Sequence, residues 1–242
     1  MIESYIGDSL KMLVENPPSS KVQTWILDPP YNIGFDYGDG FKDRQNDSAY
    51  RGWIGSLLNR CYENTQEGGS LFFIHYPEEC GRLLPFIDGS GWRLHQWLSW
   101  VYPANFGHSK RRFTTAHRTV LWLSKGEPKF NSHATVQPYK NPNDKRIKQH
   151  IANGKKGTVF YDWWEINLCK NTSKDHLGYH NQIPYTLLER CILATSNEGD
   201  FIGDPCAGSG STMRAAMLLN RHAWGCDIKA EAKEYWDKWM KN

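Results

Sequence analysis

The sequence predicts a single α/β domain with a doubly wound, mainly parallel twisted sheet. Short apolar runs alternate along the chain with segments of helical spacing, and this alternation is typical of parallel sheets with helical crossovers. Two of the expected strands end in loops rich in proline or glycine, which is where ligand sites form in such folds. The length of 242 residues suits one domain with a substantial core.

The expected elements follow from hydrophobic periodicity and from the positions of helix and strand breakers. Strands are expected at 24–27, 70–75, 94–102, 118–123, 200–203 and 223–226, and helices at 50–64, 77–87, 184–195, 211–220 and from 230 onward. Residues 32–47 contain Gly34, Gly38 and Gly40 with few apolar anchors, so we expect a mobile loop there. Residues 127–175 show little periodicity and are expected to form an irregular insertion.

Composition excludes several classes of protein. An aromatic content of 14%, with 11 tryptophans, excludes a disordered chain. No apolar run reaches membrane-spanning length and the first residues do not resemble a signal peptide, so we expect a cytoplasmic protein without membrane contact. The six cysteines form no CxxC pair and no zinc-type spacing, so neither a metal nor a disulfide framework is expected.

Positive charge is concentrated in one part of the chain. Residues 105–178 carry 14 Lys and Arg against 5 Asp and Glu, a balance of +9, whereas the rest of the chain has a balance of −6. A polyanion bound to this segment would release counterions, which favours a nucleic-acid partner. A solvated loop region with chance lysine enrichment is the alternative.

A glycine-rich motif joins an expected strand to an expected helix, with the sequence Asp204-Pro205-Cys206-Ala207-Gly208-Ser209-Gly210-Ser211-Thr212. Its glycines let the backbone approach a ligand closely, and the helix N-terminus offers unpaired N–H groups to a carboxylate or phosphate. The next expected strand ends at Asp227, which is placed to accept hydrogen bonds from ribose hydroxyls. Because Gly210 is followed by Ser211 rather than Lys, the motif does not fit a P-loop NTPase.

The tetrad Asp28-Pro29-Pro30-Tyr31 follows another expected strand. A carboxylate beside two prolines gives a rigid pair of acceptors, the Asp28 side chain and a carbonyl of the proline turn. Such a pair can accept both hydrogens of a planar amino group and free the nitrogen lone pair for attack on an electrophile. The Tyr31 ring can stack on the base that carries the amine, which must leave the duplex to be reached.

In this order, the motifs resemble those of the DNA amino-methyltransferases of the β type, in which the DPPY motif precedes a target-recognition region and the glycine-rich motif lies near the C-terminus. The likeness extends over almost the whole chain. Gly7-Asp8-Ser9-Leu10 resembles the family's segment near the cofactor adenine. The segment Asn181-Gln182-Ile183-Pro184 resembles the helix start that lines the methionine end of the cofactor. The family has a Rossmann-like methyltransferase fold, so the resemblance implies one domain over 1–242 with residues 105–178 as a basic target-recognition insertion.

The resemblance and the motifs together assign roles to individual residues. The expected catalytic residues are Asp28, Pro29, Pro30 and Tyr31. The residues expected to bind the cofactor S-adenosylmethionine are Asp8, Ser9, Asp28, Gln182, Ile183, Asp204, Cys206, Gly208, Ser209, Gly210, Ser211, Thr212 and Asp227. The residues expected to bind DNA are Lys42, Arg44, Arg111, Arg112, Lys145, Arg146 and Lys148.

The resemblance implies methylation of adenine N6 in double-stranded DNA, in a bacterial, archaeal or phage-encoded protein. The family associates an Asp-led tetrad mainly with adenine N6 and a Ser-led tetrad mainly with cytosine N4, so cytosine N4 remains an alternative. A catalytically silent nucleic-acid-binding subunit and methylation of RNA or protein are further alternatives. A homodimer and a restriction endonuclease of the same system are left open as partners.

Three residues depart from the family's pattern. Cys206 replaces a Phe, Ile183 stands where Lys is usual, and Arg118 stands where an acidic residue often follows the His, here His117. None of them belongs to the tetrad. The tryptophans at 92, 97, 100 and 122 are expected to pack in the core rather than to stack on bases. For Trp163 and Trp164, which lie beside the basic insertion, the resemblance implies packing. For His117 a structural hydrogen bond is expected rather than a catalytic role.

Overall fold

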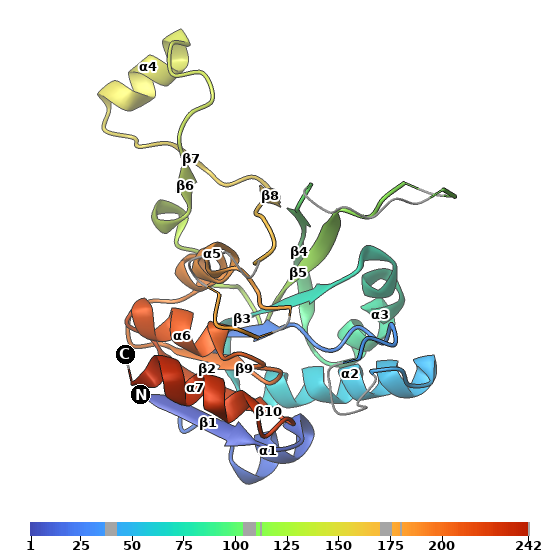
Figure 1. Cartoon of the computed structure of the whole chain (residues 1–242). Helices are drawn as coiled ribbons and strands as arrows, with labels where there is room; N and C mark the ends of the chain where they lie inside the picture. The colour runs from blue at the N-terminus through green and yellow to red at the C-terminus, as the bar shows by residue number, and fades with distance from the viewer. Residues whose placement is uncertain (37–42, 104–109, 112, 170–175, 180, 242) are drawn as a thin grey trace.

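The computed structural model describes residues 1–36, 43–103, 110–111, 113–169, 176–179 and 181–241, and its centre is one eight-stranded sheet (Figure 1). The strand order is β1-β10-β9-β2-β3-β5-β4-β8. These strands are β1 (Ile2–Ile6), β2 (Val22–Leu27), β3 (Thr65–His75), β4 (Arg93–Val101), β5 (His117–Ser124), β8 (Trp163–Glu165), β9 (Phe201–Asp204) and β10 (His222–Asp227). Among the described strands of this sheet, only the pairs β3–β5 and β5–β4 are antiparallel. The predicted doubly wound, mainly parallel sheet is confirmed.

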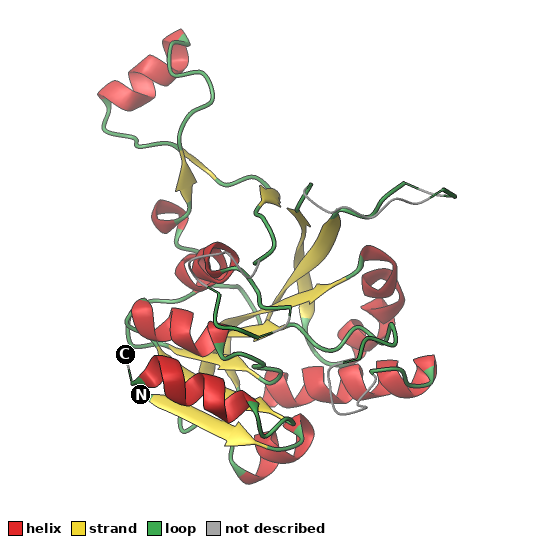
Figure 2. Cartoon of the chain, in the orientation of Figure 1, coloured by secondary structure: helices red, strands yellow, loops and turns green. Residues whose placement is uncertain are grey.

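Helices cover both faces of the sheet, as Figures 1 and 2 show. One face packs against α1 (Ser9–Glu15), α2 (Asp47–Glu63) and α3 (Pro77–Gly89), and the other against α5 (Tyr185–Thr195), α6 (Ser211–Leu218) and α7 (Ala232–Met240). Side chains of a strand alternate between the faces. Trp25 and Leu27 of β2 therefore belong to the first layer, and Ile26 belongs to the second.

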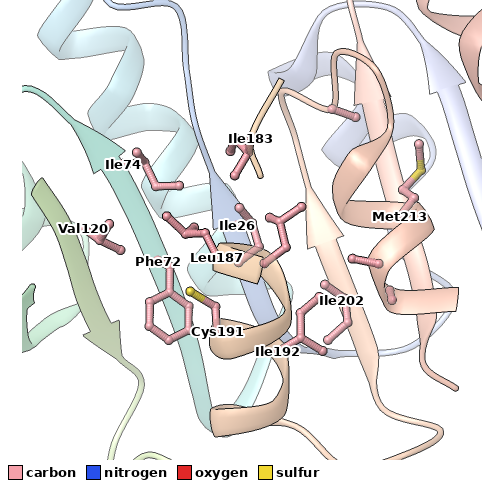
Figure 3. Close-up of a cluster of buried hydrophobic side chains, with 14 of the residues drawn as sticks. Ile26, Phe72, Ile74, Val120, Ile183, Leu187, Cys191, Ile192, Ile202 and Met213 are labelled. Atoms are coloured by element: carbon pink, nitrogen blue, oxygen red, sulfur yellow. The ribbon is translucent and has the colours of Figure 1, made fainter. Parts of the chain in front are cut away.

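The second layer is shown in Figure 3. Leu187, Cys191 and Ile192 of α5 pack against Ile26 and Phe72 of the central strands, and all five side chains are at most 1% exposed. The four-residue spacing from Leu187 to Cys191 puts both side chains on one face of the helix, which explains why periodicity located this element correctly. Burial of this face fixes α5 over the middle of the sheet.

Between β5 and α5 the chain forms an arm that stands away from the sheet (Figure 1). The arm contains η1 (Ser132–Ala134), the strand pair β6 (Val136–Gln137) and β7 (Thr158–Val159), and the helix α4 (Lys145–Ala152). It starts beside the last turn of α5, where the backbone N–H of Asn131 donates to the Ala194 carbonyl at 2.7 Å. An ion pair between Lys129 Nζ and Asp200 Oδ2, 2.8 Å apart, also fixes the start of the arm, next to the beginning of β9. The arm therefore leaves from the edge of the sheet at which the parallel strands begin.

Several expectations for the basic segment need correction. Residues 127–175 were expected to be irregular, yet they include α4 and the edge strand β8, which pairs with β4 through Ser99 and Trp163. Segment 105–178 is also not one continuous insertion outside the sheet, because it includes β5, which lies between β3 and β4. Trp97, which precedes the basic segment in β4, and Trp163 are 38% and 46% exposed rather than core residues, since β4 and β8 lie at one edge of the sheet.

In the part of the chain that the structure describes, no helix is long and apolar enough to span a bilayer. The same residues contain no group of three or more His, Cys, Asp or Glu side chains that could hold a metal ion.

Gly203 in β9 allows the closest approach inside the core. A Cβ at this position would lie 2.2 Å from the Trp25 ring, which is completely buried and donates from its indole N–H to Thr65. We predict that Gly203→Ala lowers the free energy of unfolding by about 1–3 kcal/mol through overpacking, measured by urea denaturation.

Gly52→Ala is the matched control, because a Cβ on this exposed face of α2 would meet nothing within 4 Å. This variant should gain about 0.5–1 kcal/mol from helix propensity. Equal stability of Gly203→Ala and the wild type would show that the Trp25 contact does not constrain the strand.

Candidate active site

Four neighbouring parallel strands bring four aspartates to one edge of the sheet. Asp227 and Asp204 end β10 and β9, Asp28 directly follows β2, and Asp8 lies two residues after β1. Because parallel strands have their carboxyl ends at the same edge, residues far apart in the sequence meet there. All four line a single cleft of about 640 Å³.

The proline turn after β2 directs the Asp28 carboxylate into this cleft. The Tyr31 hydroxyl donates to Oδ1 of Asp28 at 2.6 Å, and no described residue donates to Oδ2. Burial raises the pKa of Asp28 to about 6, while the Tyr31 hydrogen bond and the Arg118 charge act in the opposite direction. The carboxylate thus keeps one oxygen for a ligand.

Two buried side chains, His75 and Tyr50, hold the same turn through a chain of hydrogen bonds. The backbone N–H of Tyr76 donates to Nδ1 of His75 at 2.8 Å, so the ring proton lies on Nε2, which is 2.9 Å from the Tyr50 hydroxyl. Nε2 therefore donates to Tyr50, and the Tyr50 hydroxyl donates to the Pro30 carbonyl at 2.7 Å. Burial lowers the pKa of His75 to about 4, so the ring stays neutral at ordinary pH.

This chain of hydrogen bonds separates the roles of the two proline carbonyls. The Pro30 carbonyl is paired with Tyr50 inside the protein, whereas no described residue donates to the Pro29 carbonyl. Proline has no N–H, so the two carbonyls are the only backbone hydrogen-bonding groups that these residues provide. Pro29 therefore supplies the free backbone acceptor next to Asp28.

The glycine-rich loop closes the other side of the cleft. Gly208 has a φ of +48°, in the left-handed region, and donates its N–H to Oδ2 of Asp227 at 2.8 Å. Oδ1 of Asp227 accepts from the Lys229 N–H at 2.9 Å, so this carboxylate also orders the loop. No side chain caps α6, which leaves the N–H groups of its first turn available. Burial raises the pKa of Asp204 to about 7, against a hydrogen bond from the Cys206 N–H.

The structure brings most of the predicted cofactor residues together. Those that line the cleft are Asp8, Ser9, Asp28, Gln182, Ile183, Asp204, Cys206, Gly208, Ser209, Ser211 and Asp227. Gly210 and Thr212 do not line it. A Cβ on Gly210 would meet the Trp236 ring at 2.5 Å, so this glycine serves helix packing, and Thr212 is buried in α6. The Ser9 hydroxyl donates to the Pro205 carbonyl and so connects α1 to the glycine-rich loop.

The predicted DNA-binding residues fall into separate places. Arg44 is exposed between the cleft-lining residues Asp43 and Gln45, whereas Arg111 is exposed on the β4–β5 connection and does not line the cleft. Lys145, Arg146 and Lys148 are exposed on α4, at the end of the arm (Figure 1). Lys42 and Arg112 lie outside the described residues.

The expected mobile loop is tied together at its two described ends. The Gln45 N–H donates to the Asn32 side-chain oxygen at 2.6 Å, and Asn32 donates back to the Gln45 carbonyl at 3.2 Å. Oδ1 of Asp43 accepts from the N–H groups of Gly34 and Phe35 at 2.6 and 2.8 Å. Residues 37–42 lie outside the described part of the chain.

Sequence reasoning missed three residues of the site. No sequence pattern marks Tyr50 or His75 as functional, because a tyrosine in a helix and a histidine at the end of a strand are common as ordinary core residues. Arg118 was visible only as a departure from the family's pattern, and it lines the cleft near Asp28. His117, which the sequence singled out instead, accepts a hydrogen bond from Tyr102 through its backbone carbonyl.

Comparison with known proteins agrees with this geometry. The family model described as DNA methylase, for N6 and N4 methyltransferases, matches residues 22–238. The chain belongs to this family.

Curated relatives resemble nearly the whole chain. Type II methyltransferase M1.MboII of Moraxella bovis is 30% identical over 90% of this chain and 87% of its own length. Type II methyltransferase M.BglII of Bacillus subtilis is 29% identical over 96% of this chain, which spans 66% of that relative. The solved M1.HpyAVI–SAM complex superposes with a TM-score of 0.71 at 18% identity, covering all of both chains, and shares the fold.

S-adenosylmethionine is the cofactor of this family, and the cleft fits it. Among the described residues that line the cleft are five aspartates and two basic side chains, Arg118 and Lys229, so this lining favours a ligand with a cationic sulfonium and ammonium group. The carboxylate of Asp227 and the uncapped start of α6 suit the ribose hydroxyls and the ligand carboxylate.

The raised pKa of Asp204 gives a pH-dependence with a definite sign. An aspartate with a pKa of about 7 is ionised at pH 8 and mainly protonated at pH 6, and a cationic ligand favours the ionised form. We predict that the dissociation constant of S-adenosylmethionine rises about tenfold from pH 8 to pH 6, measured by calorimetry.

S-adenosylhomocysteine is the matched control, because it has the same amino and carboxyl groups but no sulfonium charge. Its affinity should change less over this range. Parallel pH profiles for the two ligands would contradict the role of the buried aspartates.

Proposed function

We propose that the chain methylates the N6 amino group of adenine in double-stranded DNA. The observation that carries this proposal is the pair of unpaired acceptors on two cleft-lining residues, Oδ2 of Asp28 and the carbonyl of Pro29, with Tyr31 beside them. An exocyclic amino group has two N–H donors, which is the number that this pair can accept.

The acceptor pair defines how the amine is activated. Asp28 and Pro29 each accept one N–H, and the nitrogen lone pair then points away from them into the cleft. When bound, S-adenosylmethionine supplies an activated methyl group. Oδ2 of Asp28 receives the proton that the amine loses after transfer. Catalysis rests mainly on positioning.

A base inside a duplex cannot reach the acceptor pair, so we propose that it is extruded and stacks on Tyr31. Tyr31 lines the cleft and its ring is packed from behind by His75 at a centroid distance of 4.6 Å. The Asp-led tetrad supports adenine, because the family resemblance associates Asp at this position mainly with N6 methylation.

For the DNA we propose two contact regions in a single methyltransferase domain. Arg44, next to the cleft-lining residues Asp43 and Gln45, and Arg111, on the exposed β4–β5 connection, form the first region and contact phosphates. The arm with α4 is the proposed target-recognition region, where Lys145, Arg146 and Lys148 add sequence-independent affinity. The Type II names of the relatives support a restriction endonuclease as a partner in the same system.

The function is tested by expressing the chain in a host that lacks DNA methylation and analysing the nucleosides of its DNA by mass spectrometry. N6-methyladenine is expected, and modification-sensitive sequencing then gives the recognition site. Asp28→Ala should abolish the modification while the purified variant binds S-adenosylmethionine within about tenfold of the wild type, because Asp28 accepts the amine and makes few cofactor contacts.

N4-methylcytosine in that DNA would overturn the adenine assignment. The absence of any methylated base, from a folded protein that binds the cofactor, would support a catalytically silent subunit instead. Methylation by Asp28→Ala at the wild-type rate would remove Asp28 from the mechanism.

The contribution of α4 is measured by the salt dependence of DNA binding. Replacing Lys145, Arg146 and Lys148 by Gln should reduce the slope of log affinity against log salt by about one unit for each phosphate that the variant no longer binds. A triple Gln variant of Lys11, Lys21 and Arg60, all exposed on the α1–α2 side, is the control. Equal slopes for the two triple variants would show that the arm does not bind the DNA backbone.

A further inference from the structure

Arg118 occupies a cage of tyrosines at the cleft. Because β5 runs antiparallel to its neighbours, its first residues lie at the edge where the parallel strands end. The Arg118 guanidinium carbon lies 4.4 Å from the centroid of the Tyr76 ring, 5.0 Å from that of Tyr31 and 5.2 Å from that of Tyr102. These contacts hold the cation by its attraction to the ring faces.

Hydrogen bonds connect this cation to the catalytic carboxylate. Nε of Arg118 donates to the Tyr31 hydroxyl at 3.1 Å, and one Nη donates to Tyr102. Since a guanidinium can only donate, the Tyr31 oxygen accepts from it, and the Tyr31 proton is directed to Oδ1 of Asp28 at 2.6 Å. The Arg118 charge also lowers the pKa of Asp28, to which it is connected through the Tyr31 phenol.

We propose that Arg118 is a positioning residue that acts through Tyr31. It fixes the phenol ring on which the target base stacks and keeps the Tyr31 O–H hydrogen bond directed at Oδ1, which favours the ionised carboxylate and leaves Oδ2 open to the target amine. This inference rests on the proposed function and extends it to a residue outside the tetrad. An acidic residue at position 118 would instead place a second negative charge beside Asp28.

The surroundings of Asp28 explain why this cation matters. Burial disfavours its ionised form, and Asp204 from the end of β9 adds a negative charge nearby. Tyr50 from α2, His75 from β3 and Cys206 from the glycine-rich loop also face the site, but all three are neutral at ordinary pH. Arg118 and the Tyr31 hydrogen bond are the groups that favour the ionised carboxylate.

The test is the pH profile of single-turnover methyl transfer to duplex DNA with saturating S-adenosylmethionine. The acidic limb reports ionisation of Asp28. Arg118→Gln should move its midpoint upward by about one unit, which lowers the rate on that limb about tenfold, while the plateau at high pH changes less than about threefold. Arg118→Lys keeps the charge and should stay near the wild-type midpoint.

Tyr31→Phe keeps the aromatic ring but removes the hydroxyl that joins Arg118 to Asp28 by hydrogen bonds. It should raise the midpoint by itself, and adding Arg118→Gln to it should cause a smaller shift than in the wild-type background. Lys125→Gln is the matched control, because Lys125 also lies 4.4 Å from a tyrosine ring centroid, that of Tyr62, just beyond the opposite end of β5. The acidic limb of this control should not move.

The outcomes separate this inference from the proposed function. If the wild type transfers no methyl group to DNA, the proposed function itself fails. If the wild type is active but neither Arg118→Gln nor Tyr31→Phe moves the acidic limb, only the role of Arg118 is overturned. Equal shifts for Arg118→Gln in both backgrounds would overturn its action through Tyr31. If Arg118→Gln does not fold, Arg118→Met, which also removes the charge but keeps more of the apolar contact with the tyrosine rings, replaces it in both backgrounds.

Discussion

The hydrogen bond from the Tyr50 hydroxyl to the Pro30 carbonyl determines which groups of the proline turn face the cleft. It joins α2 to the end of β2, and its direction is set by His75 at the end of β3. Because Pro30 is paired inside the protein, Pro29 and Asp28 form the free acceptor pair. Three elements of the fold thus fix one turn, which agrees with a site that acts by positioning.

The parallel sheet adds a second constraint, since it places four aspartates at one edge. Burial raises the pKa of Asp28, Asp204 and Asp227, so their ionised forms are unfavourable without a counter-charge. A cationic cofactor supplies part of that charge, and therefore its binding stabilises the folded protein. Arg118 supplies another part from the antiparallel strand β5.

Local sequence signals predicted most of the fold. The strands around 24–27, 70–75, 94–102 and 118–123 were located because they are apolar and bounded by Gly, Pro or charged residues. Their order in the sheet then brought the tetrad and the glycine-rich loop to one cleft, as the motif order implied. In these segments, local propensity and tertiary packing favour the same structure.

Features that depend on contacts between distant residues were not predictable in this way. The hydrogen bond between Tyr50 and His75 joins α2 to β3, and neither residue belongs to a sequence motif that could have indicated it. Gly210 belonged to a ligand-binding motif, yet its missing side chain makes room for Trp236. The edge strand β8 is only three residues long and Trp163 on it is exposed, so it has no alternating hydrophobic pattern that could predict it. Its backbone pairing with β4 stabilises it instead.

The central claim, that Tyr50 orients the acceptor pair, is tested most directly by single-turnover methyl transfer with Tyr50→Phe, which removes one hydroxyl. We predict a rate about 10- to 100-fold below the wild type, with an S-adenosylmethionine dissociation constant within about twofold. Tyr62→Phe, at a partly buried tyrosine near the other end of α2, serves as the control and should keep the wild-type rate. A wild-type rate for Tyr50→Phe would contradict this role of Tyr50, because the turn would then hold its acceptors without this hydrogen bond.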